Sequence, residues 1–213
     1  MISNFQNIKI LDPKVANKIA AGEVIERPAA VVKELVENSL DSDAKSVDIL
    51  VSEGGKKLIR VSDNGFGIAR DEIKLSLLRH ATSKVTQDDL LNIETFGFRG
   101  EALPSIAAVS RLRIASQRHD QDMAFELSVD FGDITDFKPV SRESGTSVAV
   151  SNLFSNVPAR LKFLKSERSE NLMIISAVKR LALSRPDVSF TMTLKDASGA
   201  RKIMNFPAFS ADD

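Results

Sequence analysis

The stretch VKELVENSLD, residues 32–41, decides the fold of this chain. Its apolar residues recur at helical spacing, which predicts an amphipathic helix over about 28–40. Glu34 and Asn38 are four positions apart and share another face of that helix, with Asp41 one turn further. The sequence therefore predicts a helix that buries one side and presents an acid and an amide on another.

Two interpretations of this polar face are open. It is either an ordinary solvated helix surface or one wall of a binding site. Magnesium prefers hard oxygen ligands, keeps several waters and usually takes only one or two protein groups together with phosphates. In a site of that kind Asn38 supplies an amide oxygen to the metal, and Glu34 orients and deprotonates an attacking water.

A second polar element, DNGFG at residues 63–67, directly follows an apolar strand candidate. One interpretation is an ordinary Asx-type turn in which the glycines permit positive φ. The other is functional: Gly65 and Gly67 lack side chains, so a planar ring can approach the backbone. Asp63 then accepts a hydrogen bond from an exocyclic amine, which selects adenine over guanine.

The third element is GFRGEAL, residues 97–103, at the end of a long segment, 80–100, with few periodic apolar positions. A helix is expected from about Glu101. Backbone N–H groups in a glycine-flanked turn at a helix start form an anion site, whereas a simple glycine hinge explains the glycines but not their position. The sequence is neither a Walker A loop nor a Rossmann fingerprint, because no Gly-Lys-Ser/Thr follows and no strand directly precedes it.

The remaining periodicity predicts an α/β (α+β) fold. Further helices are expected at 13–20, 70–78 and 171–183. Strands are expected at 47–51, 58–61, 112–114, 125–129, 134–140, 146–150, 188–194 and 202–206, with turns at 53–56 and 195–199. Strands joined by hairpins favour a mixed, mainly antiparallel sheet, with the interspersed helices on one face.

Composition narrows the class of protein. The chain has 213 residues, and its 29 basic side chains balance 29 acidic ones, so contact with DNA would need a local basic patch. No stretch approaches the roughly 18 consecutive apolar residues of a membrane span, and the N-terminus lacks a signal-peptide pattern. The absence of cysteine excludes disulfides and thiolate metal sites. We expect a soluble, cytoplasmic protein.

Taken together, these segments resemble the GHKL ATPases, the family that groups gyrase-type topoisomerases, split-ATPase heat-shock chaperones, histidine kinases and MutL. The similarity is closest to the MutL-type mismatch repair proteins. It rests on IAAGEVIERP (19–28), VKELVENSLD (32–41), DNG (63–65), RHATSK (79–84), GFRGEAL (97–103), GT (145–146) and NVPAR (156–160). The resemblance implies a Bergerat-type sandwich that holds ATP and Mg²⁺ between sheet and helices beneath a lid over 80–103.

The same resemblance implies a role for individual residues. Glu34 would be the general base, Asn38 the magnesium ligand, and Asp63 the adenine-reading acid, with Thr146 assisting through water. The predicted nucleotide-binding residues are Asn38, Asp63, Gly67, Thr82, Ser83, Lys84, Gly97, Phe98, Arg99, Gly100, Glu101, Ala102, Leu103 and Thr146. The histidine of this motif, His80, is expected to be a packing or capping residue.

The resemblance also implies an organisation and partners. Residues 1–206 would form the ATPase domain, and 207–213 would begin a linker to a second domain that carries a phosphate-contacting lysine. Expected partners are DNA, a MutS-type mismatch recognition protein and a second copy of the chain, paired when ATP binds. The alternative is an ATP-gated binding module with negligible hydrolysis.

A basic run follows the last of these motifs. Arg160, Lys162 and Lys165 are the candidate DNA contacts, and a solvated surface is the competing interpretation.

Overall fold

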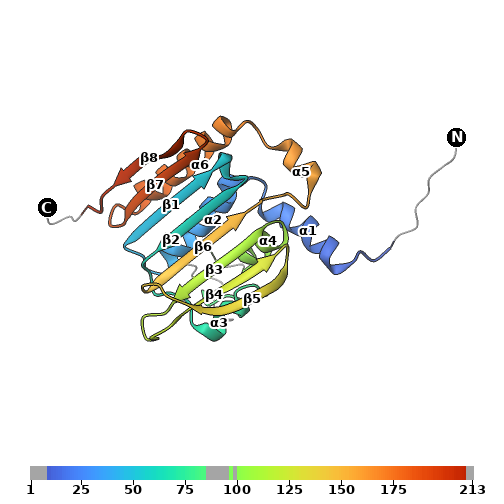
Figure 1. The fold of residues 1–213 in the computed structure, drawn as a ribbon, viewed down its shortest axis with the longest axis horizontal. Helices are drawn as coiled ribbons and strands as arrows, with labels where there is room; N and C mark the ends of the chain where they lie inside the picture. Colours follow the sequence, from blue (N-terminus) through green and yellow to red (C-terminus); the bar gives the residue numbers. More distant parts are fainter. Residues whose placement is uncertain (1–8, 85–95, 98–99, 210–213) are drawn as a thin grey trace, which may run out of the picture.

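One sheet of eight strands organises the protein in this computed structural model, which describes residues 9–84, 96–97 and 100–209 (Figure 1). The strand order is β5-β4-β3-β6-β2-β1-β7-β8. The strands are β1 (Ser46–Ser52), β2 (Leu58–Asp63), β3 (Arg111–Gln117), β4 (Ala124–Asp130), β5 (Asp133–Val140), β6 (Gly145–Ser151), β7 (Ser189–Asp196) and β8 (Gly199–Phe206). The helices are α1 (Pro13–Val24), α2 (Pro28–Asp41), α3 (Arg70–Leu75), α4 (Ala102–Ala108), α5 (Pro158–Phe163) and α6 (Glu167–Ser184), with a 3-10 turn, η1 (Glu53–Gly55).

The pairing of the strands is mixed and mainly antiparallel, as predicted. Only β1 and β7 run parallel, with Ile49 opposite Met192, and the remaining neighbours are antiparallel. A parallel pair needs a long crossover, and here the whole stretch from β2 to α6 lies between the two strands in sequence. The strand order also places the end of β2 beside the start of β6 near the centre of the sheet, with Ser62 opposite Ser147.

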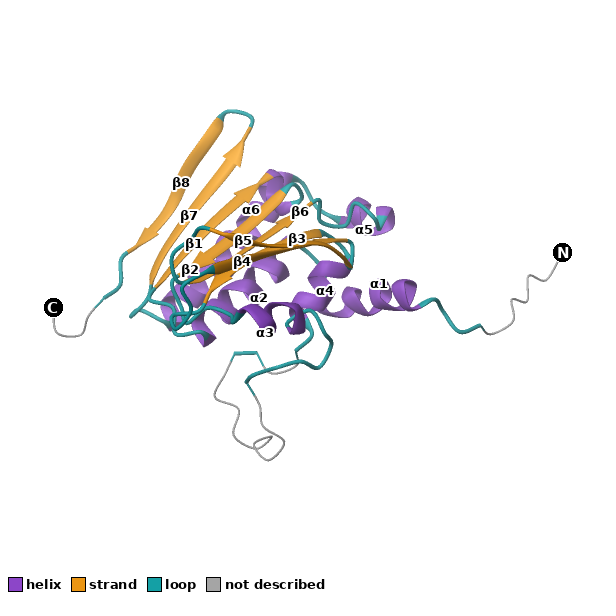
Figure 2. Ribbon diagram, turned by 60° about the horizontal axis from the view of Figure 1, so that its bottom comes forward, coloured by secondary structure: helices purple, strands orange, loops and turns teal. Residues whose placement is uncertain are grey.

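Helices α1–α4 and α6 lie on one face of the sheet, as expected from the sequence, whereas α5 lies beyond the ends of the strands (Figure 1). Figure 2 shows α2, α4 and α6 beneath the strands, with α1 and α3 at the same level. The core between these layers consists of alternating strand residues such as Val47, Ile49 and Val51 and of the apolar face of α2, including Val32 and Leu35. Burial of these apolar side chains is the main favourable contribution to folding.

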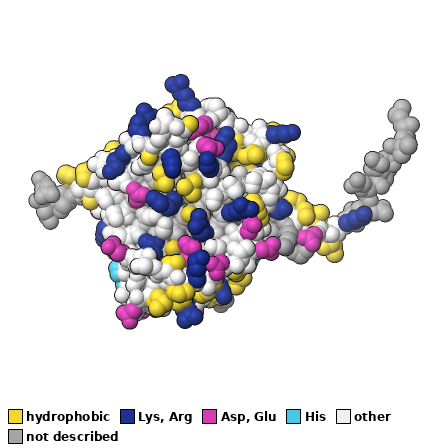
Figure 3. All heavy atoms as spheres, viewed as in Figure 1, with side chains coloured by type: hydrophobic (Ala, Val, Ile, Leu, Met, Phe, Trp, Pro, Cys, Tyr) yellow, Lys and Arg dark blue, Asp and Glu magenta, His cyan; other side chains and the backbone are white. Residues whose placement is uncertain are grey.

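The opposite face of the sheet carries mixed charges. Figure 3 shows Lys and Arg side chains interspersed with Asp and Glu over this surface. Arg60 lies 3.9 Å from Asp48, and Arg111 lies 2.9 Å from Asp130.

In the part of the chain that the structure describes, no helix is long and apolar enough to cross a membrane.

Three local features differ from the sequence-based expectations. The predicted hairpin turn after β1 contains the 3-10 turn η1, with Gly54 at φ 66°. Helix α6 begins at Glu167, four residues earlier than expected, because Ser166 caps it by accepting a hydrogen bond from Ser169 N–H. Helix α5 was not predicted, since none of its residues is buried and it therefore lacks an amphipathic period.

Candidate functional site

A cavity of about 1080 Å³ lies between α2, the central strands and the segments on either side of residues 85–95. It is lined by every described residue predicted for the site: Glu34, Asn38, Asp63, Gly67, Thr82, Ser83, Lys84, Gly97, Gly100, Glu101, Ala102, Leu103 and Thr146. Phe98 and Arg99 lie outside the described residues. Motifs spread over more than a hundred residues of sequence thus face one space.

One end of this cavity is built around Asp63, the last residue of β2. Its Oδ1 accepts hydrogen bonds from the N–H groups of Gly65, at 3.0 Å, and Thr146, at 3.1 Å. Its Oδ2 accepts a hydrogen bond from the Ser39 hydroxyl at 2.8 Å. Because these partners come from the turn after β2, from β6 and from α2, the carboxylate is held by three elements at once.

The two glycines beside Asp63 are required by close packing within the protein. A Cβ on Gly67, where φ is 74°, would lie 2.0 Å from the carbonyl oxygen of Gln117. A Cβ on Gly65 would lie 2.5 Å from the carbonyl oxygen of Ser42. Both atoms belong to backbone and cannot move aside easily. From the sequence we expected these glycines to allow a planar ring to approach the backbone. The structure gives a different reason for them, which is close packing against neighbouring backbone.

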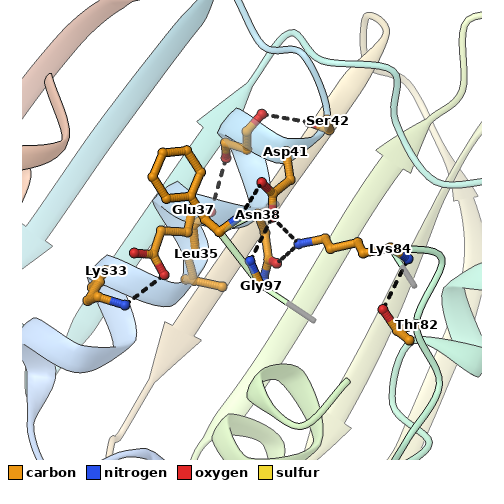
Figure 4. Close-up of polar contacts among 11 residues, drawn as sticks. Lys33, Leu35, Glu37, Asn38, Asp41, Ser42, Thr82, Lys84 and Gly97 are labelled. Atoms are coloured by element: carbon orange, nitrogen blue, oxygen red, sulfur yellow. Dashed lines mark hydrogen bonds and ion pairs between the residues drawn. The ribbon is translucent and has the colours of Figure 1, made fainter. Parts of the chain in front are cut away.

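The other end of the cavity is built around Asn38 and Asp41 on α2 (Figure 4). The Lys84 ammonium donates to Asn38 Oδ1 at 2.7 Å and to Asp41 Oδ2 at 2.6 Å. The backbone N–H groups of Phe96 and Gly97 donate to the same Asp41 carboxylate, at 3.0 and 3.1 Å. Asp41, whose side chain is only 4 % exposed, thus holds residues from both sides of the 85–95 segment against α2.

Glu34 lies one turn before Asn38 on the same helix and also lines the cavity. Burial raises the pKa of the Glu34 carboxyl above its ordinary value, and the ammonium of Lys33, 3.6 Å away, opposes this shift. A raised pKa makes the carboxylate a stronger base for a nearby proton. The position and the basicity of Glu34 therefore suit proton transfer at the cavity wall.

The predicted anion-binding turn leads into α4. Gly100 has φ 62°, and a Cβ there would lie 2.5 Å from the carbonyl oxygen of Ala81. The carboxylate of Glu101 lies 3.1 Å from His80 Nδ1 and 3.6 Å from Arg79 Nη1. His80 thus contacts the side chain of Glu101 in this turn, and the turn is fastened to the segment that carries Thr82. The packing or capping role expected for His80 stays a prediction.

Sequence reasoning missed three side chains that shape the site. Asp41 was placed on the correct face of the helix but was not assigned to the site, although its position one turn after Asn38 was the available signal. The buried Ser116 hydroxyl donates to Gly145 O at 3.0 Å and contacts Thr146 Oγ1 at 2.9 Å. Arg142 donates to Asp63 O at 3.4 Å, and burial lowers the pKa of its guanidinium. Neither of these two residues lies in a motif.

The three candidate DNA contacts have different environments. Lys162 and Lys165 are exposed at α5 and after it. Arg160 is half-buried, and its guanidinium donates to the carbonyl oxygen of Ile25 at 2.9 Å. Arg160 therefore has partners within the protein.

Comparison with known proteins identifies the family. The family model described as "Histidine kinase-, DNA gyrase B-, and HSP90-like ATPase" matches residues 26–157. The chain is 51% identical over 206 residues to the DNA mismatch repair protein MutL of Azorhizobium caulinodans, covering 97% of this chain and 32% of that protein. It is 52% identical over 188 residues to MutL of Histophilus somni, covering 87% and 31%. The chain therefore spans about a third of the length of these relatives.

Solved structures agree with this result. The Aquifex aeolicus MutL ATPase domain complexed with ADP superposes with a TM-score of 0.73 at 34% identity, over 88% of this chain and 66% of that one. The N-terminal domain of a DNA repair protein superposes with a TM-score of 0.76 at 31% identity, over 89% and 55%. The resemblance expected from the sequence motifs is confirmed, and the chain belongs to the histidine kinase-, DNA gyrase B- and HSP90-like ATPase family, in its MutL branch.

Proposed function

We propose that this chain binds ATP with magnesium and hydrolyses it to ADP and phosphate, as the ATPase domain of a mismatch repair protein. The observation that carries this proposal is the convergence of Asp63, Asn38 and Glu34 on one cavity. Support also comes from the Aquifex aeolicus relative, which has been solved with ADP. The base of the nucleotide would lie at the Asp63 end, and its phosphates at the Asn38 end.

Asp63 is suited to recognise adenine. Its carboxylate is acceptor-only when ionised, and an exocyclic amine is a donor. Because Gly65 and Thr146 already fix one carboxylate oxygen, the other is held in place and needs little reorganisation to accept a further hydrogen bond. Guanine presents a carbonyl at the corresponding position, so it would be rejected by repulsion between acceptors.

The residues at the other end fit magnesium. Asn38 and Asp41 offer two hard oxygens side by side, and the positively charged nitrogen of Lys84 already lies 2.7 and 2.6 Å from them. The described residues contain no group of three or more His, Cys, Asp or Glu side chains that could hold a metal, and magnesium needs no such group when phosphates supply its remaining ligands. When bound, magnesium would neutralise charge on the phosphate oxygens.

Glu34 would act as the general base. It would accept a proton from a water whose oxygen attacks the γ-phosphorus, while the bond from that phosphorus to the β,γ-bridging oxygen breaks. Phosphoryl transfer depends mainly on positioning and charge stabilisation. We propose that Lys84, the hydroxyls of Thr82 and Ser83 and the backbone of the 97–103 turn supply that stabilisation around the phosphates.

The proposal is tested with Glu34→Ala and Asp63→Asn. ADP binding by calorimetry and phosphate release from ATP are measured for both variants and wild type. Glu34→Ala should retain ADP affinity and lose phosphate release, while Asp63→Asn should lose about ten- to a hundredfold in affinity. Equal phosphate release by wild type and Glu34→Ala would favour the alternative, an ATP-gated binding module. A wild-type chain that does not bind ADP would refute the proposal.

The finer expectations concern the whole protein. We propose that 1–206 is the ATPase domain and that 207–213 begins a linker, that the protein acts in the cytoplasm with a MutS-type partner, and that ATP binding under the lid pairs two copies. For DNA we favour Lys162 and Lys165 over Arg160, which already has internal partners. Charge reversal at both lysines that left DNA affinity and its salt dependence unchanged would remove the DNA proposal.

A further inference from the structure

Arg160 links α5 to the C-terminal end of α1. Its Nη1 donates to the carbonyl oxygen of Ile25, one residue beyond α1, at 2.9 Å. Its guanidinium also lies over the ring of Phe154, 5.5 Å from the centroid. Phe154 is fully buried, and its N–H donates to Val109 O at 2.8 Å. The guanidinium is therefore held between a ring anchored in the core and the end of a helix.

Gly22 provides the space for this contact. A Cβ at Gly22 would lie 1.6 Å from Arg160 Nη2 and 2.4 Å from its Cζ. Glycine disfavours a helix relative to alanine, so its presence in the last turn of α1 has a cost in stability. All three of the nearest atoms to such a Cβ belong to the guanidinium, so a larger residue at this position would have to displace the Arg160 side chain.

The contact lies directly behind one wall of the nucleotide cavity. Glu23 and Val24, the two residues after Gly22, line the cavity together with Glu34. Ile25 is buried, and its carbonyl oxygen lies between α1 and the start of α2, the helix that carries Glu34. A carbonyl beyond a helix end has no donor within that helix, so the charge-assisted bond from Arg160 satisfies and fixes it.

We propose that Arg160 is a positioning residue of the nucleotide site, acting through Gly22 and Ile25 on the Glu23–Val24 wall and on the start of α2. This inference rests on the proposed function, because it assumes that the cavity holds a nucleotide. It assigns Arg160 a role inside the domain instead of a contact with DNA. Gly22 in α1 and Arg160 in α5 therefore act together, because the absence of a side chain at one position makes room for the guanidinium of the other.

The test is a double-mutant cycle of Gly22→Ala and Arg160→Ala, with melting temperature and ADP affinity as readouts. Arg160→Ala should weaken ADP binding by about five- to tenfold, since it removes a charge-assisted hydrogen bond behind the cavity wall. Gly22→Ala should weaken binding to a similar extent, because its methyl group displaces the guanidinium. The double variant should be no weaker than either single variant, since both changes break one contact.

The melting temperature gives a readout independent of nucleotide. Gly22→Ala should lower it in the wild-type background and raise it in the Arg160→Ala background, where the space is empty and alanine favours the helix. Arg160→Lys retains one donor for Ile25 and should recover part of the ADP affinity. Arg180→Ala is the matched control, because this exposed arginine donates to Ser176 of its own helix at 2.9 Å and does not line the cavity. This variant should bind ADP as wild type does.

The outcomes separate the inference from the function on which it rests. Wild-type ADP affinity in Arg160→Ala, or additive effects of the two substitutions, would overturn the positioning role while leaving nucleotide binding intact. A rise in melting temperature from Gly22→Ala alone would show that the guanidinium does not occupy this space. Failure of the wild-type chain itself to bind ADP would instead overturn the proposed function, and this inference with it.

Discussion

At one end of the cavity, Asp63 is held by two backbone N–H groups and a serine from neighbouring elements. At the other end, one flexible side chain, Lys84, bridges Asn38 and Asp41. Backbone donors on a packed strand and in the tight turn beside it lose little freedom when they bind, whereas a lysine has many rotamers to lose. The first end is therefore preorganised for a base, and the second is arranged so that a cation can exchange for the ammonium.

The largest expected effect is on stability, and it comes from a glycine-to-alanine substitution made at each end of the cavity. Gly67→Ala places a methyl group against the Gln117 backbone at positive φ and should lower the free energy of unfolding by about 2–4 kcal/mol. Gly97→Ala meets Lys84 Nζ at 3.3 Å, a side-chain end that can shift, and should cost less than about 1 kcal/mol. Urea denaturation measures both values. Equal losses would mean that the two ends are equally rigid.

A second prediction concerns the ammonium at the flexible end. Lys84→Met removes the ammonium from the nearly buried Asp41 carboxylate, whose other donors among the described residues are the two backbone N–H groups named above. The nucleotide-free protein should therefore lose about 1–2 kcal/mol of stability. Addition of magnesium chloride should recover more of that stability in the variant than it adds to wild type.

The matched control for this prediction is Lys45→Met. Lys45 forms an ion pair with Asp43 at the same 2.6 Å distance, but both side chains are largely exposed. An exposed pair of this kind contributes about 0–1 kcal/mol, so its loss should be small and should not depend on magnesium. If the two lysine variants lost equal stability, the Lys84–Asp41 contact would contribute no more than an exposed ion pair, and the prediction would be wrong.

The smallest expected effect is the pH dependence of Glu34. Because burial raises its pKa in the folded protein, the stability it contributes is present below its unfolded pKa and is lost as pH rises through the folded pKa. Ionised Glu34 therefore costs stability at neutral pH. Glu34→Gln should be slightly more stable than wild type at pH 7, and the difference should disappear as the pH falls below the ordinary pKa of a glutamate.

The rate of ATP hydrolysis should change with pH in the opposite direction from the stability contributed by Glu34. ATP hydrolysis by wild type should fall as pH decreases through the raised pKa of Glu34, since the base becomes protonated. Denaturation of Glu34→Gln and phosphate release by wild type, both measured across this pH range, check the prediction. A Glu34→Gln protein that is less stable than wild type at pH 7 would contradict the buried, desolvated carboxylate.

Local periodicity made much of this architecture predictable. The helix carrying Glu34 and Asn38 follows from apolar spacing, and the strands before Asp63 and at 189–196 follow from alternation. Helix α5 was missed because none of its residues is buried, so no apolar stripe marks it. The residue types of the site could also be predicted from the sequence. A carboxylate and an amide four residues apart on one helix suit proton transfer and magnesium binding, and nearby glycines suit tight turns.

The sequence by itself determined most of the helices and strands, and which side chains on α2 share a face, because these depend on periods of 3.6 and 2 residues within short windows. Only the tertiary structure decided that the Lys84 ammonium contacts Asn38 and Asp41. The same holds for the hydrogen bond from Arg142 to the backbone carbonyl of Asp63 and for the packing of the Arg160 guanidinium against Gly22. These contacts join residues 43 or more positions apart. They depend on strand order and helix packing, for which a local pattern carries no information.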